Sequence, residues 1–200
     1  MCKLNQMGII IRIMRLTKKY EERFKKTVRL CKGRVISFRA DQVSVPGHQV
    51  AQREFVVHPG AVGILVFESP QKIILVKQYR YPVKQFTYEI PAGKLAPGEK
   101  PLSCVRRELE EETGFRARNI SRLVSYWPTA AFSTEVIHLY LATGLIRTRP
   151  DPDEDEFLEI VTVSPRQLEG WMRSGKIRDS KTLIAYLAWK GLYSRASKIR

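Results

Sequence analysis

Three glutamates lie close together in residues 101–113, a segment whose pattern predicts a helix. Glu108 and Glu112 are four residues apart, and Glu111 follows Glu108 by three, so one helix face would carry all three carboxylates. Like charges at this spacing destabilise a bare helix by roughly a few tenths of a kcal/mol per pair. A divalent cation would reverse that sign, and clustered carboxylates suit Mg²⁺ or Mn²⁺ better than zinc. From the helix alone, an acidic, solvated face is the favoured interpretation, because such runs of glutamate are common.

The signals that bound this helix are local. Pro101 is suited to its first turn, and Gly114 follows its last residue, as at many helix ends. Leu102, Val105 and Leu109 recur at helical spacing and predict a buried face opposite the glutamates.

Runs of β-branched and aromatic residues on either side of the helix predict strands. We expect them at residues 61–67, 72–76, 86–90, 121–127, 136–142 and 157–163. Two further helices should follow Ser164 and Asp179, which are good helix N-caps. Strands interleaved with a few helices predict a single α/β or α+β domain.

Length and composition narrow the class of protein. Two hundred residues, 44% of them hydrophobic and 10% aromatic, form about one domain with a proper core, which excludes a wholly disordered chain. Cys2, Cys31 and Cys104 match neither a disulfide framework nor a zinc spacing, which indicates a reducing, cytoplasmic setting. No apolar run approaches the ~20 residues of a membrane span, so we expect neither a membrane anchor nor a signal peptide.

The formal net charge of +15 is concentrated at the ends of the chain. Residues 1–40 hold 12 Lys and Arg against two Glu, and residues 190–200 hold four basic residues and no acidic one. Residues 41–189 are nearly neutral. Basic ends could bind nucleic acid or attract a phosphorylated ligand. Because no aromatic or glycine pattern accompanies the charge, we favour solvated tails and do not expect nucleic acid as a partner.

Residues 93–115 read GKLAPGEKPLSCVRRELEEETGF. They match the pattern G-x5-E-x7-R-E-U-x-E-E-x-G-U, where U is a bulky apolar residue, at every defined position. This is the Nudix box, and the chain resembles Nudix hydrolases. The resemblance implies an α/β/α sandwich with a mixed sheet and a loop-helix-loop, preceded here by an N-terminal β-rich segment. It also implies divalent-metal-dependent hydrolysis of a nucleoside diphosphate linked to another group.

Segments outside the box resemble the ADP-ribose pyrophosphatase subfamily. They are QYRYP at residues 78–82, EIPAG at 89–93, Arg53-Glu54, HPGAV at 58–62 and DEDEF at 153–157. The similarity covers residues 31–192, so we expect a basic segment at 1–30, a Nudix domain at 31–192 and a basic tail at 193–200. It implies hydrolysis of ADP-ribose to AMP and ribose 5-phosphate by a homodimer.

The resemblance also implies roles for individual residues. Glu108, Glu111, Glu112 and the Ala92 carbonyl correspond to ligands of Mg²⁺ or Mn²⁺. Among the substrate-binding candidates, Arg53 and Arg80 correspond to contacts with the diphosphate or the terminal ribose, because guanidinium groups suit phosphate oxygens. Glu89, the third candidate, corresponds to an acidic group near the metal or the substrate. The catalytic candidates are Glu156, Glu111 and Arg107. Glu156 would be the general base, with Glu154 as the alternative, and Arg107 would hold one carboxylate in place.

One departure concerns the substrate. Many ADP-ribose hydrolases carry Ser-Pro-Gly downstream of the box, where residues 129–131 are Thr-Ala-Ala here. The change leaves the expected chemistry intact and leaves the second half of the substrate open. The alternatives are another substrate such as GDP-mannose, NADH or FAD, a 5′ end of RNA reached through the basic termini, or a nucleotide sensor without turnover.

Overall fold

The computed structural model describes residues 20–47, 49–149 and 157–192 of the chain. Contacts between residues divide the chain into two units. Unit 1 holds the described residues up to His58 together with Thr129–Thr134, and unit 2 holds the others. No helix in these described ranges is both long and apolar enough to cross a membrane.

Unit 1 is built on an antiparallel sheet of β1 (Arg23–Lys32), β2 (Ser37–Ser44) and β3 (Val50–Val57), in that order. This confirms the predicted N-terminal β-rich segment. The predicted domain start at residue 31 falls inside β1. The segment Thr129–Thr134 lies along the end of β3, because the Val56 N–H donates to the Phe132 carbonyl at 2.9 Å and the Thr134 N–H to the Val56 carbonyl at 3.0 Å.

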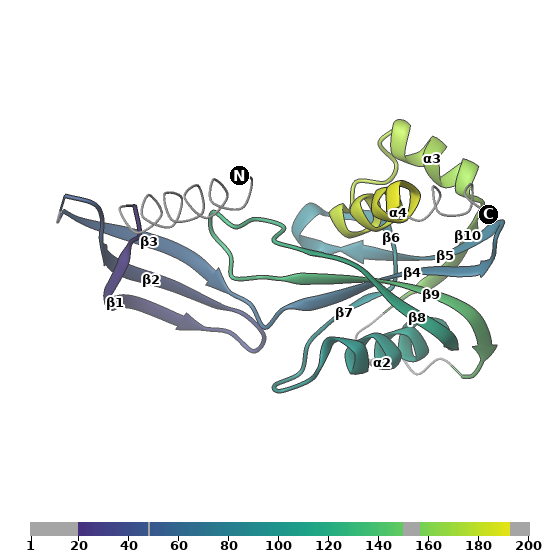
Figure 1. Ribbon diagram of the computed structural model, residues 1–200, viewed down its shortest axis with the longest axis horizontal. Coiled ribbons are helices and arrows are strands. Elements are labelled where there is room, and N and C mark those ends of the chain that lie inside the picture. Colours follow the sequence, from purple (N-terminus) through teal and green to yellow (C-terminus); the bar gives the residue numbers. More distant parts are fainter. Residues whose placement is uncertain (1–19, 48, 150–156, 193–200) are drawn as a thin grey trace, which may run out of the picture. The chain divides into compact units, whose positions relative to one another are not determined.

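Unit 2 contains a mixed sheet with helices on both faces (Figure 1), as predicted. Its path runs β10-β5-β4-β9-β8, with β6 paired to β5 and β7 paired to β4, and β4 and β9 are parallel. The strands are β4 (Ala61–Ser69), β5 (Lys72–Arg80), β6 (Gln85–Glu89), β7 (Ala92–Lys94), β8 (Phe115–Tyr126), β9 (Ile137–Arg147) and β10 (Glu159–Val163).

The central strand β4 explains how the two layers form. Its side chains alternate between the sheet faces, so Leu65 joins one core cluster and Ile64 and Val66 join the other. Both faces are covered, and β4 is therefore a continuous apolar run rather than an alternating one.

The helices are α2 (Pro101–Thr113), α3 (Pro165–Arg173) and α4 (Ser180–Leu192), and a short 3-10 helix, η1 (Tyr81–Val83), follows β5. Helix α2 packs on one face through Val105 and Leu109, whereas α3 and α4 pack on the other. These positions agree with the three helices predicted.

Strands β8 and β9 are longer than predicted. They pair from Phe115 opposite Arg147 to Tyr126 opposite Ile137. The first half of β8 carries exposed Arg116 and Arg118, and such polar side chains conceal a strand that is stabilised by its pairing rather than by apolar composition.

Candidate active site

Helix α2 carries the carboxylates between two well-defined ends. Pro101 occupies its first turn, and Gly114 ends it in the left-handed region with φ 67°, where its N–H donates to the Glu110 carbonyl at 2.8 Å. The predicted apolar stripe was partly wrong, because Leu102 is 38% exposed and Cys104 is buried instead.

The glutamates do not lie opposite the core as expected. Glu108 and Glu112 are only 7% and 5% exposed. Glu108 and Glu112 share one face of the helix with Cys104, and this face is next to the one formed by Val105 and Leu109. Only Glu111 keeps substantial exposure, with about a third of its side chain accessible. Two carboxylates are therefore inside the protein, where a partner is needed to offset their charge.

Strand β7 covers the buried carboxylates. A Cβ atom on Gly93 would lie 1.8 Å from the Glu108 carboxyl carbon, so only glycine fits there. The Ala92 N–H donates to Glu112 Oε2 at 3.0 Å. Strand β7 is itself paired to β4, with Ala92 opposite Gly63. The sheet thus determines where the backbone meets the helix.

Arg107 ties the carboxylates together. Its Nη1 donates to Glu108 Oε1 at 2.7 Å and to Glu111 Oε2 at 2.9 Å. Its Nε and Nη2 donate to both oxygens of Glu99 at 3.1 and 3.0 Å, and Nη2 also reaches the Lys94 carbonyl at 3.2 Å. The hydrogen bond from Arg107 lowers the pKa of Glu99 to about 2, and these carboxylates raise the pKa of Arg107. Such contacts indicate that Arg107 positions the carboxylates.

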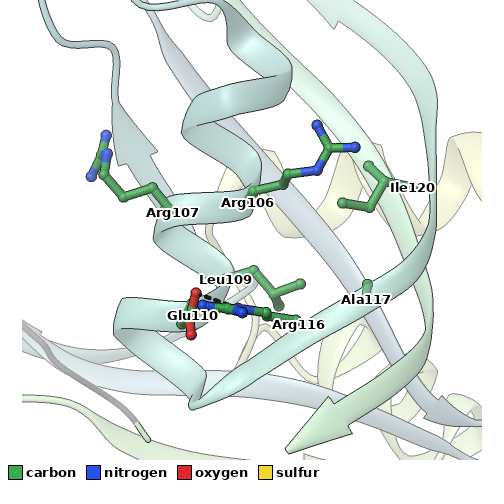
Figure 2. Close-up of a pocket in the computed structure, with 7 residues that line it drawn as sticks. All are labelled: Arg106, Arg107, Leu109, Glu110, Arg116, Ala117 and Ile120. Carbon is green, nitrogen blue, oxygen red and sulfur yellow. Dashed lines mark hydrogen bonds and ion pairs between the residues drawn. The ribbon is translucent and has the colours of Figure 1, made fainter. Parts of the chain in front are cut away.

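A groove of about 390 Å³ lies on another side of α2, against β8. Both Arg106 and Arg107 line this groove. In Figure 2, Arg106 extends toward Ile120, whereas the guanidinium group of Arg107 points away from Ile120. Arg116 pairs with Glu110 at 2.8 Å. Adjacent arginines therefore have different environments, and Arg106 provides a matched control for Arg107.

We expect Arg107→Met to lower the free energy of unfolding by ~2 kcal/mol, because three carboxylates lose their shared donor while the apolar stem is kept. Added MgCl₂ should restore part of that loss, since a cation that binds the folded state stabilises it. Urea unfolding with and without MgCl₂ measures both effects. Arg106→Met should unfold like the parent, and equal stability of the two variants would contradict the positioning role of Arg107.

A second charge cluster lies beside β5 and β6. Arg80 Nε and Nη2 donate to the two oxygens of Glu89 at 2.8 and 2.7 Å. Thr87 donates to the same carboxylate at 2.7 Å, and Lys181 of α4 donates at 3.1 Å. Glu89 is 3% exposed. Burial alone would raise its pKa, but the bonds from Arg80 and the charge of Lys181 outweigh burial and lower it to about 2.

This second cluster is electrostatically connected to the first. Arg80 has a raised pKa, caused chiefly by its hydrogen bond to Glu89, and the charge of Glu112 contributes. Sequence reasoning identified Arg80 and Glu89 but missed Lys181. The helix start at Asp179 was the available signal, because it places Lys181 in the first turn of α4.

Comparison with known proteins places the chain in a family. The model of the NUDIX domain matches residues 57–186. The chain belongs to the Nudix family. It is 40% identical over 170 residues to the methanol dehydrogenase activator of Bacillus methanolicus and 36% identical over 170 residues to the ADP-ribose pyrophosphatase of Bacillus subtilis (strain 168). Each alignment covers 84% of this chain and 92% of the relative.

A solved structure supports the Nudix fold. The crystal structure of an ADP compounds hydrolase superposes with a TM-score of 0.75 at 17% identity, covering 86% of this chain and 96% of the other. The family match and the relatives confirm the predicted resemblance, and this superposition confirms the predicted fold class.

The Nudix helix has the donor chemistry of a divalent-cation site. Glu108, Glu111, Glu112 and the Ala92 carbonyl offer hard oxygen donors, and the lack of a side chain at Gly93 lets the Glu108 carboxylate lie directly against the backbone of β7. Within the described ranges, no three acidic, His or Cys side chains converge in a metal-holding arrangement. Arg107 contacts two of these carboxylates directly. The donor set fits Mg²⁺ or Mn²⁺, and the ligand assignment stays a prediction.

The roles predicted for Arg53, Glu156 and Glu154 are not tested by the structure. Arg53 is in unit 1, where its Nε donates to Glu22 Oε2 at 2.9 Å and its Nη2 contacts Glu22 Oε1. Its role in substrate binding stays a prediction. Glu156 and its alternative Glu154 lie outside the described residues, so the assignment of the general base is untested.

The low pKa of Glu89 predicts how stability depends on pH. Because its folded-state pKa is below its ordinary value of 4.5, Glu89 stabilises the fold above about pH 4.5, and that contribution disappears as the pH falls toward 2. The contribution is on the order of 3 kcal/mol.

Glu89→Gln should be less stable at pH 7 and should lose less stability on acidification than the parent. Glu68→Gln, at a surface pair with Lys72, is the control. Parallel pH profiles from urea unfolding for the Glu89 variant and the parent would refute the prediction.

Proposed function

We propose that this protein hydrolyses the diphosphate of ADP-ribose to AMP and ribose 5-phosphate, using Mg²⁺ or Mn²⁺. The observation that carries the proposal is the intact Nudix box folded around Arg107, with two buried glutamates beside β7. The substrate rests on the Bacillus subtilis relative, because the alignment covers almost all of that ADP-ribose pyrophosphatase.

The residues divide the work of diphosphate hydrolysis. When bound, the cation neutralises negative charge that develops on the diphosphate oxygens. Arg80 binds the diphosphate through its Nη1, whose N–H groups meet no hydrogen-bond acceptor in the described part of the chain. A water oxygen forms a bond to one phosphorus while the bond from that phosphorus to the bridging oxygen breaks. Glu156 takes the proton from the water, with Glu154 as the alternative base.

The segment Thr129–Thr134 supports keeping other substrates in the test. It contains Ala130 and Ala131 in place of proline and glycine, and its turn is closed by the Ser133 N–H, which donates to the Thr129 carbonyl at 3.1 Å. Phe132 is 57% exposed in this turn. A turn can thus form without Pro-Gly, although its sequence differs at the positions expected to shape the substrate loop.

The test is a panel assay with Mg²⁺ or Mn²⁺ and an EDTA control. ADP-ribose, ADP-glucose, GDP-mannose, NADH, FAD and a 5′-triphosphorylated RNA are offered, and the released nucleotide or phosphate is identified. We expect the highest kcat/KM for ADP-ribose, with AMP as product. Preference for another diphosphate would keep the Nudix chemistry and reject ADP-ribose, whereas no turnover of any compound would reject the enzyme and favour a sensor.

A second candidate function follows from the Bacillus methanolicus relative, whose alignment covers 92% of that methanol dehydrogenase activator. By this alternative, the protein would act on a partner dehydrogenase. The direct test adds the purified protein to Bacillus methanolicus methanol dehydrogenase and measures alcohol oxidation. Stimulation that requires Glu112 would favour this candidate, and an unchanged rate would reject it.

We also propose a cytoplasmic homodimer. The sheet of unit 1 exposes Phe24, Val28, Leu30 and Val50, each by about half or more, which is the composition of a surface that a second copy covers. Light scattering should give twice the chain mass. A monomer at assay concentration would reject the dimer.

The free thiols of Cys31 and Cys104 support a reducing compartment, as the cytoplasmic location requires.

A further inference from the structure

The first turn of α4 contains a compact set of polar contacts that the Nudix box does not explain. Asp179 precedes the helix, and its Oδ2 accepts from the Thr182 N–H at 2.9 Å and from the Thr182 hydroxyl at 2.7 Å. Its Oδ1 accepts from Lys181 Nζ at 2.5 Å. Thr182 is fully buried, and Lys181 is half-buried, with 15% of its side chain exposed.

The contacts of Lys181 lead from this turn to Arg80, the residue proposed to bind the diphosphate. Lys181 Nζ donates to Glu89 Oε2 at 3.1 Å, and Arg80 Nη2 donates to the same oxygen at 2.7 Å. Glu89 also accepts from Arg80 Nε and from Thr87. Its oxygens therefore face four donors, and Glu89 is better placed to hold Arg80 than to bind a ligand itself.

The contacts of Thr182 lead from this turn to the backbone next to Glu112. The Ile90 N–H donates to the Thr182 hydroxyl at 2.9 Å. Two residues later, the Ala92 N–H donates to Glu112 Oε2. Thr182 thus anchors the short stretch of chain that leads from Glu89 to the contact with Glu112.

We propose that the first turn of α4 is the positioning element of the site: Lys181 orients Arg80 through Glu89, and Thr182 orients Ala92 and Glu112 through Ile90. The inference deepens the proposed function and rests on Arg80 binding the diphosphate. By this proposal, Lys181 and Thr182 act through other residues and do not contact the substrate. Adjacent residues of one helix then govern different kinetic constants, because Arg80 acts in binding and Glu112 in the chemical step.

The kinetic test uses conservative variants with a control on the same helix. Lys181→Met should raise KM about tenfold with kcat within about twofold, and Thr182→Val should lower kcat about tenfold with little change in KM. Lys190→Met removes a surface pair with Glu169 and should leave both constants unchanged. In an Arg80→Ala background, Lys181→Met should change KM by less than about twofold. The same KM effect with and without Arg80 would overturn the proposal.

A second measurement does not depend on the substrate. The Nε–H of Arg80 should give a protected resonance in a ¹H–¹⁵N spectrum, assigned by its loss in Arg80→Lys. Lys181→Met should accelerate its exchange with solvent, whereas Lys190→Met should not. Unchanged exchange would overturn the positioning role. Faster exchange with unchanged KM would instead reject Arg80 as the diphosphate contact and so count against the proposed function. If Lys181→Met is poorly folded, Lys181→Arg decides, because retained donors should recover the parent KM and exchange rate.

Discussion

Glu112→Gln should lower kcat by about a thousandfold or more while leaving the fold intact. The carboxylate is proposed to hold a divalent cation, and loss of that charge removes several kcal/mol of transition-state stabilisation. The amide oxygen can still accept from the Ala92 N–H, which now donates to Glu112 Oε2 at 3.0 Å, so the contact with β7 survives. Steady-state kinetics and thermal unfolding measure the two properties separately.

The matched control is Glu110→Gln on the same helix. Glu110 pairs with Arg116 at the groove beside β8 and is not one of the buried carboxylates. We expect its kcat to stay within about twofold of the parent. Near-normal turnover of Glu112→Gln, or equal losses in the two variants, would show that the cation does not bind where we place it.

Gly93→Ala should lower kcat about a hundredfold without removing any functional group. The new methyl group would lie 1.8 Å from the carboxyl carbon of Glu108, so either that carboxylate or strand β7 must move. A displacement of about 1 Å at a reacting centre costs on the order of 10²-fold in rate. The crowding should also destabilise the fold by about 1–3 kcal/mol.

Gly170→Ala is the control for this substitution. Gly170 lies in α3, where an added Cβ would meet no atom of the described chain within 4 Å beyond its chain neighbours and the backbone of its own helix. Alanine should therefore stabilise that helix by up to about 1 kcal/mol. Kinetics and urea unfolding of both variants are compared. Full activity in Gly93→Ala would mean that the buried position of Glu108 is not needed for catalysis.

The ends of α2 could be read directly from the sequence because the signals are local. Pro101 and Gly114 bound the helix at the predicted residues. The spacing of the Nudix box also placed three carboxylates on neighbouring turns, since this follows from 3.6 residues per turn. Which flank of the helix is buried could not be read in the same way. It depends on β7, which approaches Glu108 so closely that Gly93 has no room for a side chain.

The roles of Arg107 and Glu89 illustrate the same division. Their charge and their place in motifs were evident from the sequence, but their hydrogen-bond partners were not. Arg107 is shared among three carboxylates, and Glu89 receives donors from two strands and a helix. A side chain whose hydrogen-bonding groups are all occupied by protein partners acts by positioning its neighbours. The sequence alone does not show which side chains are occupied in this way.

The sequence by itself determined the family, the three helices, the strands from β4 onward except β7, and the set of carboxylates, because motifs, caps and periodicity are encoded within a few neighbouring residues. Only the tertiary structure decided that Glu108 and Glu112 are buried and that Lys181 contacts Glu89. Lys181 is 92 residues from Glu89 along the chain. Their contact exists because α4 packs across the sheet that carries β6, and no local pattern encodes that packing.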